Sequence, residues 1–137
     1  MEISLRRLEE IPILELRGSL IAGEPCHMLR ERFTELKQLD PRVIVDLSQV
    51  EYIDSSGLGT LVNGFTMLDR AGGGLRILSP SERDMELMVL TKLASVFQVF
   101  DDEKEAVNSF FADRETKKFD ILNFVQEQRR NKESKES

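Results

Sequence analysis

The stretch from Val43 to Gly59, which reads VIVDLSQVEYIDSSGLG, changes its hydrophobic period from that of a strand to that of a helix. Its first five positions form a near-continuous apolar run, which is typical of a central strand covered on both faces. From Leu58 onward the apolar side chains recur at helical spacing, at Leu58, Leu61, Val62, Phe65 and Leu68. Ser55 and Ser56 therefore lie on a turn at a helix N-terminus, where free N–H groups favour an oxygen or a phosphate.

The elements on either side predict an α/β fold with a mixed sheet of four to five strands and about four helices. Apolar residues alternate on both sides of Glu9-Glu10, which indicates a β-hairpin. A helical stripe follows Pro25, a short strand is expected at 75–78, and Ser81 is a candidate N-cap for the next helix. An edge strand is expected at 96–100, followed by a helix that begins near Asp102.

The last segment of the chain differs in composition from the rest, and we interpret residues 114–137 as a C-terminal extension of a domain at residues 1–113. The extension holds an apolar cluster, for which we expect a short helix at 117–126, and then a polar tail that we expect to be disordered. The cluster can dock on its own domain, pair with a second copy to give a homodimer, or bind another protein.

The net charge of −6 is unevenly distributed, because residues 116–137 contribute +2 and leave −8 for residues 1–115. An acidic body disfavours nucleic acid, whose binding depends on neutralising phosphates, and suits a basic protein partner. The single cysteine, Cys26, excludes an internal disulfide and fits a reducing compartment. Neither a signal peptide nor a membrane span is visible, so we expect a cytoplasmic protein.

The DSSGLG motif after a VDL strand resembles the signature of the STAS domain, in particular that of the bacterial anti-sigma factor antagonists. The resemblance covers roughly Met1 to Asp113. In that family the serine directly after the aspartate is phosphorylated, and that position is Ser55 here; Ser56 is the second candidate. The resemblance implies a partner-binding loop made of Asp54, Ser55, Ser56, Gly57, Leu58 and Gly59.

The same resemblance implies a non-enzymatic binding module. Unphosphorylated protein would bind an anti-sigma factor that is also a serine kinase, and so release a sigma factor for transcription. A separate phosphatase would remove the phosphate. The alternative is a structural STAS subunit of a sensory, stressosome-like assembly or of a lipid-transport assembly, without a phosphorylation cycle.

The chain departs from the family at one position near this loop. The antagonists commonly read G-E-L-D after the second strand, whereas Gly18-Ser19-Leu20-Ile21 stands here, so the carboxylate is absent at Ile21. Glu24 is the candidate for its place as an acidic neighbour of the serines. The departure leaves room for the structural alternative.

Ordinary helix capping also explains the loop, since Asp54 or Ser56 can serve as the N-cap. Leu58 can point into the core or outward to the partner, and the helical stripe favours the core. Gly57 and Gly59 would allow close approach of a kinase. Catalysis has little support, because the serine context is not that of a nucleophile elbow. Cys26 and His27 are adjacent and do not make a metal pair, and the glycine runs lack the spacing of nucleotide-binding motifs, so no cofactor is expected.

Overall fold

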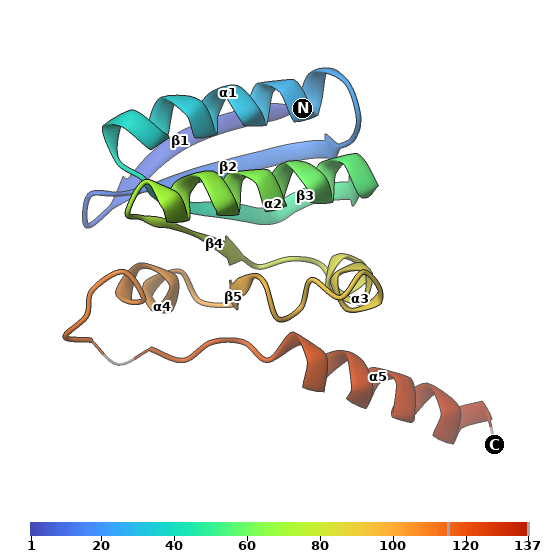
Figure 1. Ribbon diagram of the computed structural model, residues 1–137. Coiled ribbons are helices and arrows are strands. Elements are labelled where there is room, and N and C mark those ends of the chain that lie inside the picture. The colour runs from blue at the N-terminus through green and yellow to red at the C-terminus, as the bar shows by residue number, and fades with distance from the viewer. Residues whose placement is uncertain (115, 137) are drawn as a thin grey trace.

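A five-stranded sheet in the order β1-β2-β3-β4-β5 forms the middle of the computed structural model, which describes residues 1–114 and 116–136 (Figure 1). The strands are β1 (Glu2–Leu8), β2 (Ile11–Leu20), β3 (Arg42–Ile53), β4 (Gly74–Leu78) and β5 (Gln98–Phe100). The helices are α1 (Glu24–Leu39), α2 (Ser55–Arg70), α3 (Glu82–Leu90), α4 (Glu103–Asn108) and α5 (Ile121–Glu136). The predicted mixed α/β fold is confirmed, and the edge strand expected at 96–100 is present as Gln98–Phe100.

The first two strands form the predicted hairpin. They pair antiparallel, with Leu8 opposite Ile11. Glu9 and Glu10 take φ values of 49° and 70°, so both central residues lie in the left-handed region, as a type I′ turn requires. The turn geometry that Asn-Gly usually supplies is here adopted by two glutamates, which suits the twist of the strands they join.

All other neighbouring strands pair in parallel, and one helix connects each pair. The carboxyl ends of β2, β3, β4 and β5 therefore meet at one edge of the sheet. Ligands and partners of α/β proteins are commonly met at this edge, because the loops that follow the strands gather there. The two serines follow β3 directly and lie at this edge.

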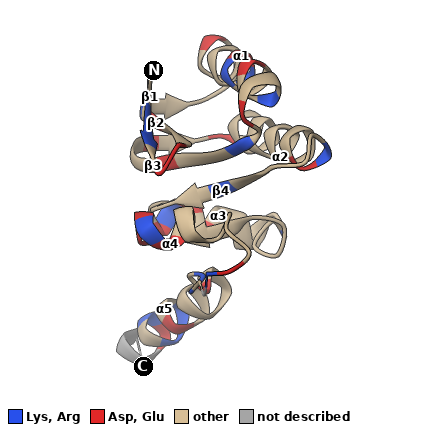
Figure 2. Ribbon diagram, turned by 90° about the vertical axis from the view of Figure 1, so that its left-hand side faces the viewer, with Lys and Arg blue, Asp and Glu red and all other residues tan. Residues whose placement is uncertain are grey.

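Helices cover both faces of the sheet (Figure 2). The main core lies under α1, α2 and α3, and a smaller cluster under α4 includes Ile44 and Phe100. Val43, Ile44 and Val45 of β3 are fully buried, which confirms the prediction of a central strand from the apolar run. Burial of both faces holds this strand in register and so fixes the position of the residues that follow it.

The C-terminal extension docks on its own domain, beside the edge strand β5 (Figure 1). The backbone N–H of Phe119 donates to the carbonyl of Val99 at 2.8 Å, so the extension covers part of an edge that would otherwise be unpaired. Ile121 and Val125 are each 3% exposed and belong to the main core. Their burial leaves these two side chains unavailable for pairing with a second copy.

Helix α5 differs from the expected helix at 117–126 with a disordered tail, because it starts at Ile121 and continues to Glu136. The tail is too polar to form a core, but glutamine, glutamate, arginine and lysine are good helix formers. Arg129 Nη2 lies 3.9 Å from Glu86 Oε1 of α3, so the second half of the helix also runs beside the domain. The low hydrophobicity of the tail is thus compatible with a helix, although it prevents the tail from forming a core of its own.

Replacing Ile121 by alanine should lower the free energy of unfolding by about 2–5 kcal/mol, because it leaves a cavity in the main core. The adjacent Leu122, which is 47% exposed, provides the matched control. Its replacement by alanine should cost less than about 1 kcal/mol. Urea unfolding of both variants measures the difference, and equal losses would contradict the docking of the extension.

Candidate phosphorylation loop and partner surface

The two candidate serines begin helix α2. β3 ends at Ile53, Asp54 is the N-cap, and Ser55 and Ser56 are the first two helical residues, both exposed. Among the residues that the structure describes, neither serine hydroxyl takes part in a hydrogen bond within the chain. Both hydroxyls are therefore accessible for phosphorylation. They lie at the positive end of the α2 dipole, which favours an added phosphate electrostatically.

Asp54 caps the helix, and it also joins two loops. Its Oδ1 accepts from the N–H of Gly57 at 2.8 Å, and its Oδ2 accepts from the N–H of Ala22 at 3.0 Å. The N–H of Asp54 donates to the carbonyl of Leu20 at 3.3 Å. The expectation of helix capping is thus met by Asp54 and not by Ser56. The loop after β2 is held against the start of α2.

The hydrogen bonds to Asp54 stabilise its ionised form. The N–H of Ala22, followed by that of Gly57, lowers the pKa of Asp54 below its ordinary value of 3.8. The carboxylate is therefore charged throughout the physiological range. Its negative charge stands immediately before the serines.

Gly57 and Leu58 face the domain interior, although the sequence placed them in the partner-binding loop. A Cβ on Gly57 would lie 2.2 Å from the carbonyl oxygen of Leu20, so the missing side chain allows α2 to pack against β2 rather than a kinase to approach. Leu58 is 3% exposed and belongs to the core, as its helical stripe predicted. Gly59 is exposed with open space around it. The accessible part of the loop is therefore Ser55, Ser56 and Gly59, with Asp54 half-buried beneath them.

The region where the family carboxylate was expected presents an apolar side chain. Ile21 is 37% exposed and precedes Ala22, which Asp54 holds next to the serine loop. Glu24 is exposed at the first position of α1. Within the described part of the chain, no hydrogen bond or ion pair joins Glu24 to the loop, so it does not take the place of the missing carboxylate by direct contact.

The sequence analysis did not predict a hollow of about 200 Å³ next to the serine loop. One of its lining residues is Ile53, which directly precedes Asp54. The hollow lies between Tyr52 and Ile53 of β3 and the residues Arg83, Leu87 and Leu90 of α3. The Arg83 guanidinium carbon is 4.8 Å from the centre of the Tyr52 ring. Tyr52 is 40% and Leu90 65% exposed, and their sequence separation gave no signal that they share a surface.

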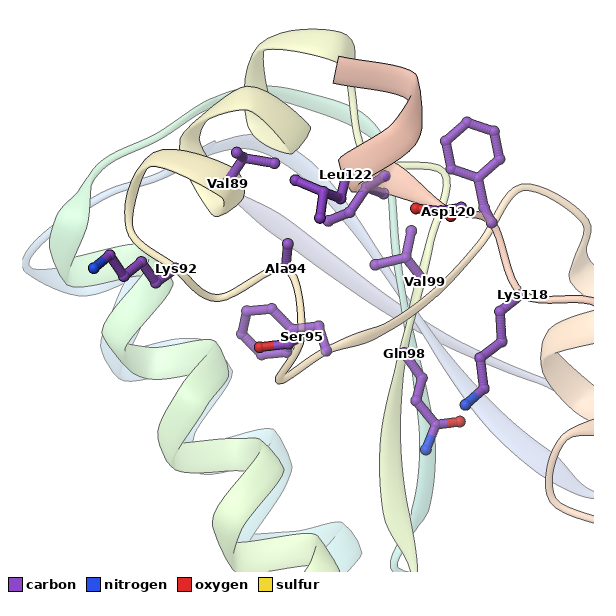
Figure 3. Close-up of a pocket in the computed structure, with 12 residues that line it drawn as sticks. Val89, Lys92, Ala94, Ser95, Gln98, Val99, Lys118, Asp120 and Leu122 are labelled. Atoms are coloured by element: carbon purple, nitrogen blue, oxygen red, sulfur yellow. The ribbon is translucent and has the colours of Figure 1, made fainter. Parts of the chain in front are cut away.

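A larger cavity, of about 700 Å³, lies away from the serine loop, where the extension meets α3 and β5. Figure 3 shows Val89, Ala94, Val99 and Leu122 around it, with Lys92 and Lys118 on opposite sides. Its lining contains no residue of the serine loop. Residues 118–122 of the extension form part of its lining.

The remaining candidates from the sequence lie in α1. Cys26 is 2% exposed and packs in the core, as a small apolar side chain does. His27 Nε2 lies 3.0 Å from an oxygen of Glu31, one helical turn away. In the described ranges no three residues of the metal-ligating types come together, and no helix is both long and apolar enough to cross a bilayer.

A family model described as STAS domain matches residues 2–106. The anti-sigma-B factor antagonist of Bacillus subtilis (strain 168) is 34% identical over 83 residues, which cover 58% of this chain and 76% of that protein. The chain is also 33% identical over 66 residues to a candidate anti-sigma factor antagonist of Thermotoga maritima, covering 48% of this chain and 58% of that protein.

Solved structures match over a larger part of the chain. The crystal structure of a candidate anti-sigma factor antagonist from Thermotoga maritima matches with a TM-score of 0.72 and 26% identity, and covers 79% of this chain and 93% of that one. The anti-sigma factor antagonist SpoIIAA in its unphosphorylated form matches with a TM-score of 0.62 and 19% identity, covering 79% and 96%. The second likeness bears on the fold alone.

Replacing Gly57 by alanine should destabilise the protein by about 1–3 kcal/mol, since the new methyl group would collide with backbone that cannot easily move. Gly59 is the matched control in the same helix. Alanine at Gly59 meets no atom within 4 Å, and helix propensity predicts a gain of about 0.5–1 kcal/mol. The midpoint of thermal unfolding should fall for Gly57→Ala and rise for Gly59→Ala. A shift of both midpoints in the same direction would contradict the close approach of Gly57 to the Leu20 carbonyl.

The charge of Asp54 should stabilise the folded protein above about pH 3.8, the ordinary value. Because its pKa is lowered in the folded state, this contribution declines as the pH falls below that value and is absent below the folded pKa. Asp54→Asn keeps a capping oxygen but removes the charge. The difference in unfolding free energy between wild type and variant should therefore shrink with acidification, and a difference independent of pH would contradict the assignment.

Proposed function

The chain belongs to the STAS domain family, and on this premise we propose that it is an anti-sigma factor antagonist whose docking is controlled by a phosphate on Ser55. The observation that carries the proposal is the exposure of the Ser55 hydroxyl at the first position of α2, with Asp54 fixed beside it. The unphosphorylated protein binds an anti-sigma factor that is also a serine kinase, and so releases a sigma factor. A separate phosphatase resets the switch.

The phosphate acts on docking and leaves the fold in place. It adds about −1.5 to −2 charges and three acceptor oxygens at the start of α2. The helix dipole favours it locally by a few tenths to about 1 kcal/mol. A partner packed against the neutral hydroxyl would have to bury a near-divalent anion beside the Asp54 carboxylate, and such a desolvated charge costs several kcal/mol. The second effect is larger, so phosphorylation abolishes binding.

The surface beside Ser55 supports protein docking. Two exposed apolar side chains lie close to the loop: Ile21 precedes Ala22, which is hydrogen-bonded to Asp54, and Tyr52 lies near the end of β3. The hollow between Tyr52 and Leu90 adds a concave region that can accept a partner side chain. Aromatic and aliphatic anchors in such hollows commonly supply most of the binding free energy.

Two features of the relatives support this role. The Bacillus subtilis relative is named an anti-sigma-B factor antagonist. SpoIIAA, whose fold this chain shares, has structures both in the unphosphorylated and in the phosphorylated form. We place the phosphate on Ser55 rather than Ser56 from the position of the motif. We assign no catalytic step to the chain itself, and we place its action in the cytoplasm.

One observation favours the structural alternative, a STAS subunit without a phosphorylation cycle. The apolar Ile21 stands where the antagonists carry a carboxylate, so a charge near the serine is absent. Homodimerisation through the extension has less support, because Ile121 and Val125 are buried in their own domain. The experiment below separates the antagonist from the structural subunit.

Incubation with the anti-sigma kinase of the same organism and ATP should add one phosphate to the wild type and none to Ser55→Ala, as intact mass measures. Ser56→Ala should still be modified. Wild type and Ser55→Ala should bind the anti-sigma factor with similar affinity in calorimetry. Ser55→Asp should bind about a hundredfold more weakly, because the carboxylate puts a buried charge beside Asp54.

Ser95→Asp is the matched control, since Ser95 is exposed but lies in the lining of the larger cavity, outside the serine loop. It should bind as wild type does. Equal tight binding by Ser55→Asp would refute the phosphate control. Absence of any modification, with recovery in a large assembly or with a permease, would favour the structural alternative.

A further inference from the structure

A second surface lies on the helical layer, away from the serine hydroxyls. Helices α1 and α2 enclose an open groove of about 470 Å³, which we call the basic groove. Every charged residue in its lining is basic, namely Arg30, Lys37 and Arg70, and all three are exposed. They stand out in a chain whose first 115 residues carry a net charge of −8.

The walls of the basic groove follow from helical spacing. On α1, Arg30, Thr34 and Lys37 recur at i, i+4 and i+7 and share one face. Asn63 and Arg70 mark the corresponding face of α2. Arg30 and Lys37 are seven residues apart in sequence, so they are separated by about 10 Å along the helix axis. The groove is therefore lined over about two helical turns by cations at its ends and by hydroxyl and amide groups between them.

Its floor is apolar because two helices approach closely at a glycine. A Cβ on Gly64 would lie 2.4 Å from the ring of Phe33, so a larger residue would push α1 and α2 apart. Phe33 is 1% exposed, and Met67 is half-buried beside it. The groove thus combines an apolar floor with basic and polar walls.

The cations of the groove are available to a ligand. In the described part of the chain, none of the three lies within 4.0 Å of a carboxylate oxygen. Arg30 Nη1 makes a 3.4 Å contact with the hydroxyl of Thr60, which brings its guanidinium across from α1 to α2. Lys37 and Arg70 lie in the last turns of their helices, where the dipole favours cations. The helix dipole explains the positions of Lys37 and Arg70, but it explains neither the position of Arg30 nor the apolar floor between the three cations.

We infer that the basic groove binds an acidic amphipathic helix of another protein. Its carboxylates would pair with Arg30, Lys37 and Arg70, and its apolar side chains would pack on Met67, the half-buried apolar side chain of the lining. Nucleic acid is a poorer occupant, because the acidic remainder of the domain repels phosphates. This inference does not depend on modification of Ser55, since none of the lining residues belongs to the serine loop.

A synthetic helical peptide with leucines at every third or fourth position among glutamates is the probe. Titrated into the isotope-labelled full chain, it should shift the backbone amide signals of Thr34, Asn63 and Thr66, and its affinity should fall as ionic strength rises. The triple substitution Arg30→Gln, Lys37→Gln, Arg70→Gln should weaken binding by about tenfold or more. The same peptide with lysines in place of glutamates should not bind.

The matched control removes two arginines and one lysine elsewhere, by Arg17→Gln, Lys104→Gln and Arg130→Gln, all at exposed positions. It should bind the acidic peptide as wild type does, which separates the groove from net charge. Equal weakening in both triple variants, shifts mapped to another surface, tighter binding of a DNA duplex, or salt-sensitive self-association through the groove would each overturn the inference. The amide shifts of the wild type decide the outcome even if the groove variant does not fold.

Discussion

The carboxylate of Asp54 connects the two loops on which the candidate site depends. One oxygen caps α2 through Gly57, and the other holds Ala22, so the end of β2 and the start of α2 are fixed to each other. The bare backbone of Gly57 lets α2 approach the carbonyl of Leu20 at this point. These contacts fix the turn that carries the two serines relative to the end of β2.

This arrangement separates a rigid support from a small accessible surface. Leu58 and Gly57 anchor the start of α2 in the domain, while the serine hydroxyls stay in solvent. A charge added to such a surface changes what can dock on it without altering the packing below. The extension supports the partner surface indirectly. Helix α5 packs against α3, and α3 forms one wall of the hollow next to Tyr52.

The basic groove and the serine loop lie on the same helix but present different chemistry. The first turn of α2 offers neutral hydroxyls beside a carboxylate, whereas its later turns carry Asn63 and Arg70 above an apolar floor. A protein of this size can therefore contact one partner at the carboxyl edge of its sheet and a second on its helical layer. The basic groove is lined by three cations, whereas the serine loop carries one carboxylate, and this difference in charge disfavours exchange of their partners.

The sequence by itself determined the order of elements, the central strand and the position of Ser55, because these depend on local periodicity and on a contiguous motif. It also placed Leu58 in the core by its spacing. Only the tertiary structure decided that Asp54 binds Ala22, that Gly57 serves packing, and that the extension docks beside β5 as a helix reaching Glu136. Those facts depend on contacts between segments distant in the chain, and residue spacing along one segment carries no information about the segment it will meet.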